Sequence, residues 1–314
     1  MKNLIVSTSP HIQTKRTTTM IMAHVLIALI PTVIASVVLF GIRSLFIIIA
    51  CTLSAVLSEF IFNAITKKDQ TVKDLSAVIT GVLLALTLPA SVPIWQCVIG
   101  SVFAIVVVKC LFGGIGCNFA NPAVTARVFL LLAFTEVGGG CITRFMNDVE
   151  AGATPLETMK GGTVEGLPSL TDMLLGNRAG AIGETCALAL LIGFIYLVAT
   201  RVIKPHVPVI YIGTVFLLSF AINGDVNFAL YQILSGGLML GAVFMATDYV
   251  TSPLTTLGKS VFALGCGVLT VLIRLFGSYP DGVSFAILIM NILSPYIEKL
   301  TLKKPLGGVK NDKK

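Results

Sequence analysis

Between residues 113 and 122 the chain carries a polar, glycine-rich interruption, GGIGCNFANP, that separates two apolar runs. Its glycines allow the backbone to approach a flat ligand closely. The side-chain amides of Asn118 and Asn121 can each donate and accept hydrogen bonds. In a membrane protein, irregular backbone is tolerated where protein buries it or where it lines a cavity. Two interpretations stay open: a ligand-binding loop that includes Gly114, Asn118 and Asn121, or a tight turn in which asparagine caps the next helix.

A second polar stretch, DVEAGATP at residues 148–155, ends in a hydroxyl side chain at Thr154. Gly152 permits positive φ and Pro155 restricts the residue before it, so composition alone predicts an exposed turn. Thr154 is a poor nucleophile by itself, because no His or Lys lies beside it in the sequence to take its proton.

The cysteines and histidines do not form a metal-binding pattern. The 7 cysteines contain no C-x-x-C pair, and the 3 histidines are equally scattered. Most of the cysteines lie in apolar runs, where a thiol packs as a small hydrophobe. We therefore expect no metal site, no iron–sulfur cluster and no complete active site within this chain alone.

The elements that must position these groups are long and apolar. Of the 314 residues, 55% are apolar and 12% are charged, about half the charged share of a soluble domain, and the mean hydropathy is +0.94. This balance excludes an ordinary soluble enzyme, a nucleic-acid binder and a disordered regulator. It predicts an all-α polytopic membrane protein rather than a barrel. Ten apolar runs are candidate transmembrane helices: about 20–40, 44–65, 74–90, 94–112, 121–137, 180–201, 207–223, 227–246, 260–278 and 282–299.

The longest polar segment divides these spans evenly. We expect a first five-helix half at 1–137, a loop at 138–179, a second five-helix half at 180–300 and a basic tail at 301–314. An odd number of spans in each half gives the halves opposite orientations, as in inverted-repeat transporters. The similar interruptions FGGIGCNFANPAVTAR and GAVFMATDYVTSPLTTLGK are a further hint of a repeat.

Basic residues predict the orientation, because cytoplasmic loops retain Lys and Arg. With the N-terminus inside, most of the 22 basic residues face the cytoplasm, Lys109 and Arg127 among them. The outer side then keeps Arg43, Arg144, Lys160, Arg178 and Arg274. Both termini are therefore expected in the cytoplasm and the 138–179 loop outside. We therefore attribute the net charge of +7 to the basic residues that set this topology and not to binding of a nucleic acid.

Five blocks, in order along nearly the whole chain, resemble the D component of the Rnf complex: SPHIQTKRTTTMIM, DLSAVITGVLLALTLP, LFGGIGCNFANPAVTAR, FMATDYVTSPLT and PDGVSFAILIMNILSPYIE. That family assembles a ferredoxin:NAD oxidoreductase that moves Na⁺ or H⁺, and the B component of the Na⁺-translocating NADH:quinone reductase is a relative. The resemblance implies a bacterial or archaeal cytoplasmic membrane. It also implies partners in the other Rnf subunits, one of which carries a second covalent FMN.

The resemblance also implies a covalent cofactor. Residues 148–154 are similar to the flavinylation motif D-x-x-[S/T]-G-A-T, in which a membrane flavin transferase joins the phosphate of FMN to the threonine hydroxyl. By this match Thr154 carries the FMN, and Asp148, Gly152 and Ala153 complete the motif. Ala151 stands where the family has Ser or Thr, so we expect modification to persist with lower efficiency.

A second flavin is implied by the asparagine pair. In the quinone-reductase relative such a pair is associated with non-covalent riboflavin, and Asn118 and Asn121 match it. On this resemblance, flavin contact is the favoured interpretation of the loop.

Acidic residues in the spans of the same relative are linked to cation uptake, and Glu59, Asp248 and Glu298 match them. An ionisable group within a span costs roughly 2.5–3.5 kcal/mol on insertion scales, which makes each a functional hypothesis. The competing interpretation is that Glu59 and Glu298 extend to the interface beside Lys67 and Lys299.

The sequence thus predicts a membrane redox protein that carries covalent FMN and riboflavin. It would pass electrons across the membrane within a complex coupled to Na⁺ or H⁺ movement. The alternative is a redox-free channel or transporter for a small polar solute, since the same architecture fits both and fold does not decide function. The flavinylation motif favours the redox protein, because a channel has no use for it.

Overall fold

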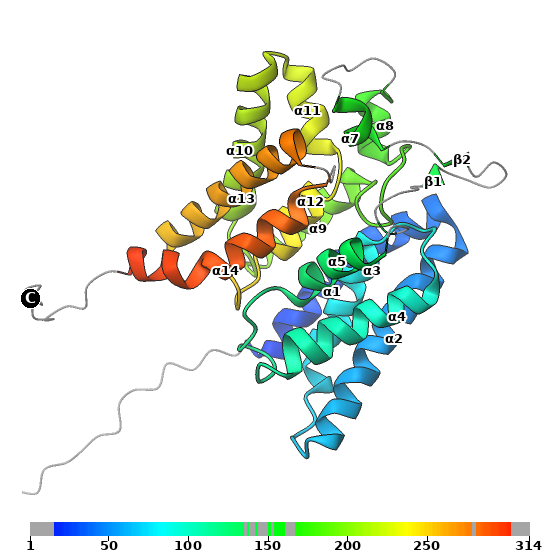
Figure 1. Ribbon diagram of the computed structural model, residues 1–314, viewed down its shortest axis with the longest axis vertical. Helices are drawn as coiled ribbons and strands as arrows, with labels where there is room; N and C mark the ends of the chain where they lie inside the picture. The colour runs from blue at the N-terminus through cyan, green and yellow to red at the C-terminus, as the bar shows by residue number, and fades with distance from the viewer. Residues whose placement is uncertain are drawn as a thin grey trace, which may run out of the picture.

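The computed structural model describes residues 16–134, 137, 142–143, 150–151, 154–160, 167–277 and 281–302. The expected motif residues Asp148, Gly152 and Ala153 lie outside this part of the chain. The described residues are mainly helical (Figure 1).

Five helices are long and apolar enough to cross a membrane: α1 (Thr18–Phe40), α2 (Ile42–Ile65), α10 (His206–Asn223), α13 (Thr256–Phe276) and α14 (Val283–Thr301). A sixth span is formed if α11 (Val226–Leu234) is joined to α12 (Leu238–Leu240) and the π-helix η3 (Gly241–Met245), across a bend of 66°. These spans define a multi-pass membrane protein.

Four of the expected spans are shorter apolar helices. They are α3 (Ser76–Thr87), α4 (Ile94–Val102) continued by the π-helix η2 (Phe103–Cys110), α5 (Pro122–Ala133) and α9 (Ala187–Ala199). Each of the ten apolar runs therefore contains a helix, but these four are short of the about 20 residues that cross a bilayer.

Smaller elements complete the described chain. They are η1 (Val72–Asp74), α7 (Pro155–Met159), α8 (Leu170–Leu175) and the strands β1 (Ile142–Thr143) and β2 (Glu150–Ala151), which pair antiparallel.

The long helices expose apolar side chains, and they bury the short helix α3 between them. Ile34 and Val38 on α1, Phe46 and Leu53 on α2, and Leu217 on α10 are all more than half exposed, as a lipid-facing surface requires. In contrast, nearly every residue of α3 is buried. A short helix is stable at this depth because protein, not lipid, surrounds its ends.

Helices from the two halves pack into one assembly. In the first half α2 contacts α3 and α4, and in the second α13 contacts α10 and α14. The halves meet where α1 packs on α9 and where α5 packs on α14 (Figure 1).

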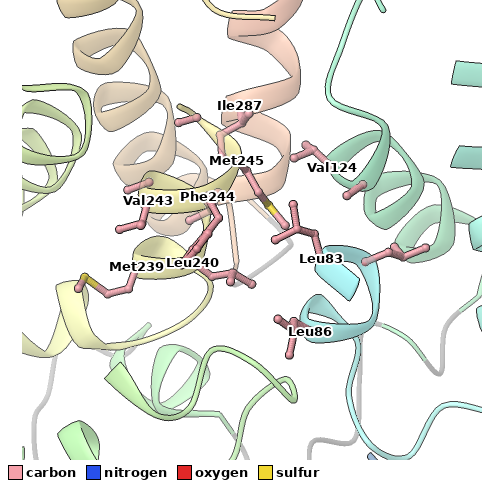
Figure 2. Close-up of a cluster of buried hydrophobic side chains, with 14 of the residues drawn as sticks. Leu83, Leu86, Val124, Met239, Leu240, Val243, Phe244, Met245 and Ile287 are labelled. Carbon is pink, nitrogen blue, oxygen red and sulfur yellow. The ribbon is translucent and has the colours of Figure 1, made fainter. Parts of the chain in front are cut away.

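The core lies at this junction. Figure 2 shows the α12–η3 segment, through Met239 to Met245, facing Leu83 and Leu86 of α3 and Val124 of α5. The bent span of the second half is thus held against the short helices of the first.

Candidate functional site

Two similar interruptions, the first at residues 113–122 and the second at residues 241–259, meet in the core. Asn121 caps α5, because its Oδ1 accepts hydrogen bonds from the backbone N–H groups of Ala123 (3.0 Å) and Val124 (3.4 Å). Its Nδ2 donates to the carbonyl of Met245 at 3.5 Å, at the end of η3. The capping interpretation is confirmed, and the same amide joins the first interruption to the second.

A cavity, here called the Asn118 cavity, lies between the interruptions. Its apolar walls come from α1, α3, α9 and η3, and its polar groups come from the two interruptions, η2 and α3. Among its residues are Val25, Leu83, Val243, Phe244, Lys109, Asn118, Asn121 and Asp248. The Oδ1 of Asn118 is buried and has no hydrogen-bond partner in the described chain. A buried amide oxygen without a partner costs free energy, so it indicates a position where a ligand donor would bind.

Asp248 belongs to the same cavity. Its Oδ1 accepts from the N–H of Val250 at 3.3 Å and its Oδ2 from the hydroxyl of Thr251 at 3.1 Å. Asn118, Asn121 and Asp248, which lie up to 130 positions apart in sequence, are therefore brought to one place by the fold.

Two π-helical segments, η2 and η3, lead into the interruptions. Such segments are rare and are often found at functional sites. The η2 segment places Lys109 in the wall of the cavity with only 2% of its surface exposed.

A second, wider space lies on the other side of Lys109. This cup is lined by Glu59, Asn63, Lys67, Lys68, Asp69, Thr71, Cys110, Gly113 and Gly114. Its volume is about 410 Å³, against about 100 Å³ for the Asn118 cavity. Gly114 has φ of 92°, which favours glycine, and it lines this cup and not the cavity.

Glu298 is separate from these groups. It lies near the end of α14, half-buried, and lines neither the cavity nor the cup. Glu59, by contrast, is 1% exposed and lines the cup together with Lys67.

Thr154 begins α7 and is half-buried, where composition alone predicts an exposed turn. Its Oγ1 accepts from the N–H of Glu157 at 3.4 Å, and its own N–H donates to Oε2 of Glu157 at 2.8 Å. This capping box holds the hydroxyl oxygen as an acceptor. Leu156 and Met159 pack α7 against Phe228 and Tyr231 of α11.

The Thr154 cavity, about 50 Å³, lies beside this hydroxyl. Its charged lining comes from α5 and two loops: Arg127, Glu184 and Asp281, with Glu157 at the rim. Apolar walls come from Leu131 and Leu156. Arg127 and Thr154 line this cavity together with the carboxylates of Glu157, Glu184 and Asp281. An arginine guanidinium can form bidentate hydrogen bonds with the oxygens of a phosphate ester.

Two further buried arginines stabilise this region. Arg178 donates to the carbonyls of Glu184 (2.6 Å) and Thr185 (3.2 Å). Burial lowers the pKa of Arg178 to about 10, so this group stays charged at neutral pH. Arg274 donates to the carbonyls of Gln232 (2.6 Å) and Ser235 (3.0 Å), which the break between α11 and α12 leaves without helical partners.

The two cavities follow one another along the same helix, since the Asn118 cavity runs beside α3 from Ser76 to Leu83 and the Thr154 cavity lies beyond its end. Ser76, the first residue of α3, lines the Asn118 cavity, and Pro89, just beyond the end of α3, lines the Thr154 cavity.

Four of the basic residues that the sequence analysis assigns to a membrane face are buried in the protein. The positive-inside pattern predicts Lys109, Arg127, Arg178 and Arg274 at the membrane faces, but they are 2%, 8%, 4% and 4% exposed. Each one has internal partners. Lys109 lines the Asn118 cavity and Arg127 lines the Thr154 cavity, whereas Arg178 and Arg274 line neither. For Lys109, Arg127 and Arg274 a signal existed, since each lies within an apolar run.

Two of the cysteines lie together in the core, where the Sγ of Cys51 donates to the backbone carbonyl oxygen of Cys97 at 4.0 Å. Among the described residues Cys51, Cys97, Cys110 and Cys266 are buried and Cys117 is exposed. The described chain also holds no group of three metal-ligating side chains.

The architecture is that of a helical, multi-pass membrane protein in which two broken segments enclose a polar cavity. Residues 5–307 match the model of the NQR2, RnfD, RnfE family, and the chain belongs to that family.

Relatives in this family match along nearly their full length, and each is named as the D component of a complex. The chain is 44% identical to the D component of the Na⁺-translocating ferredoxin:NAD⁺ oxidoreductase complex of Acetobacterium woodii, and the match covers 98% of this chain and 96% of that protein. It is 38% identical to that of the proton-translocating ferredoxin:NAD⁺ oxidoreductase complex of Clostridium ljungdahlii, covering 98% and 97%. It is 35% identical to that of the ion-translocating oxidoreductase complex of Methanosarcina acetivorans, covering 99% and 100%.

Proposed function

We propose that the chain is the D component of an ion-translocating ferredoxin:NAD⁺ oxidoreductase complex, in which it passes electrons across the membrane. The names and full-length coverage of its relatives support the assembly and the reaction class. The observation that carries the redox role is the pair of cavities that follow one another along α3, one beside Thr154 and one beside the asparagine pair.

Covalent FMN is proposed on Thr154. The residues fit this group: the hydroxyl borders a cavity with apolar walls, and the Arg127 guanidinium lines the same cavity. Arg127 would bind the phosphate, and the capping box would hold the threonine oxygen in place. A membrane flavin transferase and a second covalent-FMN protein of the complex are proposed partners by the family resemblance.

Riboflavin is proposed in the Asn118 cavity. The apolar walls match a flat ring, and the buried Oδ1 of Asn118 offers an acceptor to a ring N–H. Bound flavins supply one- and two-electron transfer, while the protein supplies orientation and electrostatics. Phe244 and Leu83 would exclude water, and Asn121 would fix the loop through its contact with Met245.

For the coupled ion, Asp248, Glu59 and Glu298 are the proposed pathway residues. The support differs among them, because Asp248 lines the Asn118 cavity and Glu59 lines the cup. Glu298 has the resemblance alone.

We further propose ten transmembrane segments in inverted halves, 1–137 and 180–300. The 138–179 loop would lie outside, and the 301–314 tail would lie in the cytoplasm with the N-terminus. In this arrangement the short helices α3, α5 and α9 span the bilayer together with their flanking loops, which the surrounding helices shield from lipid.

Gel fluorescence tests the proposal. The chain is co-expressed with a flavin transferase, denatured and run on a gel, where covalent FMN gives a fluorescent band. Thr154→Ala should abolish this band, and Thr154→Ser should keep part of its intensity. Thr158→Ala is the matched control, since this exposed hydroxyl lies one turn further along α7. An intact mass without the FMN increment in the wild-type chain would refute covalent FMN and favour the redox-free channel.

A further inference from the structure

Lys109 and Glu59 form a buried ion pair between the two spaces on either side of η2. The Nζ of Lys109 lies 2.7 Å from Oε1 of Glu59 and 2.7 Å from Oγ of Ser76. The side chains are 2% and 1% exposed. Removing either partner from such a pair leaves an uncompensated buried charge, so each depends on the other.

The pair also separates the two spaces. Lys109 and Ser76 line the Asn118 cavity, whereas Glu59 lines the cup. On the cup side, Oε1 of Glu59 also accepts from the hydroxyl of Thr71 at 2.6 Å. The lysine thus presents its charge to the cavity, and the glutamate presents its charge to the cup.

The carboxylate of Glu59 is only half satisfied. Its Oε1 accepts from both Lys109 and Thr71, but its buried Oε2 has no hydrogen-bond partner in the described chain. A buried carboxylate oxygen without a donor is positioned to bind a further cation or proton.

We propose that Lys109 is a positioning residue whose single positive charge is shared between the occupant of the Asn118 cavity and Glu59. This inference rests on the proposed function, because the occupant must be a redox cofactor. When one electron arrives in the cavity from a redox centre of a partner protein in the complex, the Lys109 ammonium is drawn toward the added negative charge. The Glu59 carboxylate then binds one monovalent cation from the cup. One electron and one cation enter together, so the net buried charge is unchanged.

The physical basis is the weak screening between buried groups. In a low-dielectric interior, charges a few ångströms apart interact far more strongly than in water. Lysine suits the task because its charge lies at the end of a flexible four-carbon chain. Electron arrival and cation binding are therefore linked through one side chain.

The test is a redox titration of the purified whole complex. It follows the part of the flavin absorption that is missing from a complex carrying Asn118→Leu, because that part belongs to the non-covalent flavin. Lys109→Gln should lower the equilibrium constant for reduction of this flavin by tenfold or more. A tenfold change corresponds to a fall of about 59 mV in the midpoint potential for one electron. Glu59→Gln should shift the potential in the opposite direction, because it leaves the lysine charge unshared. Lys73→Gln removes an exposed charge on η1 as the matched control and should leave the potential unchanged.

A double variant, Lys109→Gln with Glu59→Gln, guards against misfolding, because it removes both charges and keeps groups able to hydrogen-bond. It should retain riboflavin. The potential of the wild type should depend on the concentration of Na⁺ or H⁺, and the potential of the double variant should not. A wild-type complex without riboflavin overturns the proposed function and this inference together. Two outcomes overturn the inference alone. One is that riboflavin is present and has the same potential in the wild type and in Lys109→Gln. The other is that riboflavin is present in the double variant and its potential keeps the cation dependence of the wild type.

Discussion

At the scale of single residues, the two asparagines of the first interruption have different tasks. Asn121 is used by the fold, since it caps α5 and bridges to Met245. Asn118 has a buried oxygen that the described chain does not satisfy. The residue with no structural partner for its oxygen is therefore the better probe of ligand binding.

Asn118→Leu should weaken riboflavin binding about tenfold or more, because a lost hydrogen bond in a buried site costs about 1–3 kcal/mol. The measurement is the riboflavin content of the purified protein after denaturation. Asn223→Leu, at the exposed end of α10, is the matched control. Full riboflavin content in the Asn118 variant would rule out this amide as a ligand contact, and an unchanged covalent FMN band would show that the variant is folded.

At the scale of elements, the short helices depend on close packing. A Cβ added at Gly81 of α3 would lie 2.6 Å from the Cα of Thr52 in α2. Small residues at such crossings let the backbones of membrane helices approach closely. This contact orients α3, and α3 in turn separates the two cavities.

Gly81→Ala should lower the stability of the protein in detergent by about 1–3 kcal/mol, because the methyl group meets backbone that cannot move away. Gly213→Ala in α10 is the control, since its Cβ would meet nothing within 4 Å. The check is the midpoint of thermal unfolding for both variants. Equal midpoints would show that the α2–α3 crossing has room to adjust.

At the scale of the whole molecule, the orientation proposed from basic residues does not depend on the four basic residues that are buried. Lys109 and Arg127 leave the inner set, and Arg178 and Arg274 leave the outer set. The excess of the inner set is preserved, because most of its members lie in loops and tails.

The expected topology places Lys160, between α7 and α8, outside and Lys204, between α9 and α10, in the cytoplasm. Both are exposed. With the exposed Cys117 and with Cys141, which lies in the proposed outer loop, first replaced by serine, Lys160→Cys should react with a membrane-impermeant maleimide in intact spheroplasts, and Lys204→Cys should react only after lysis. Reaction of both variants before lysis would contradict the proposed orientation.

The sequence by itself determined the class of protein and the location of the main apolar helices, because apolar runs separated by polar breaks are local features that any membrane fold must respect. It also marked Asn118, Asn121, Asp248 and Thr154 as chemically distinctive. Only the tertiary structure decided which of these share a cavity, since residues from α3, η2 and two distant loops meet there. It also showed that Lys109 and Glu59, 50 positions apart, form one buried pair. Charge pairing in a low-dielectric interior depends on distances in space, and those arise from helix packing that no local pattern contains.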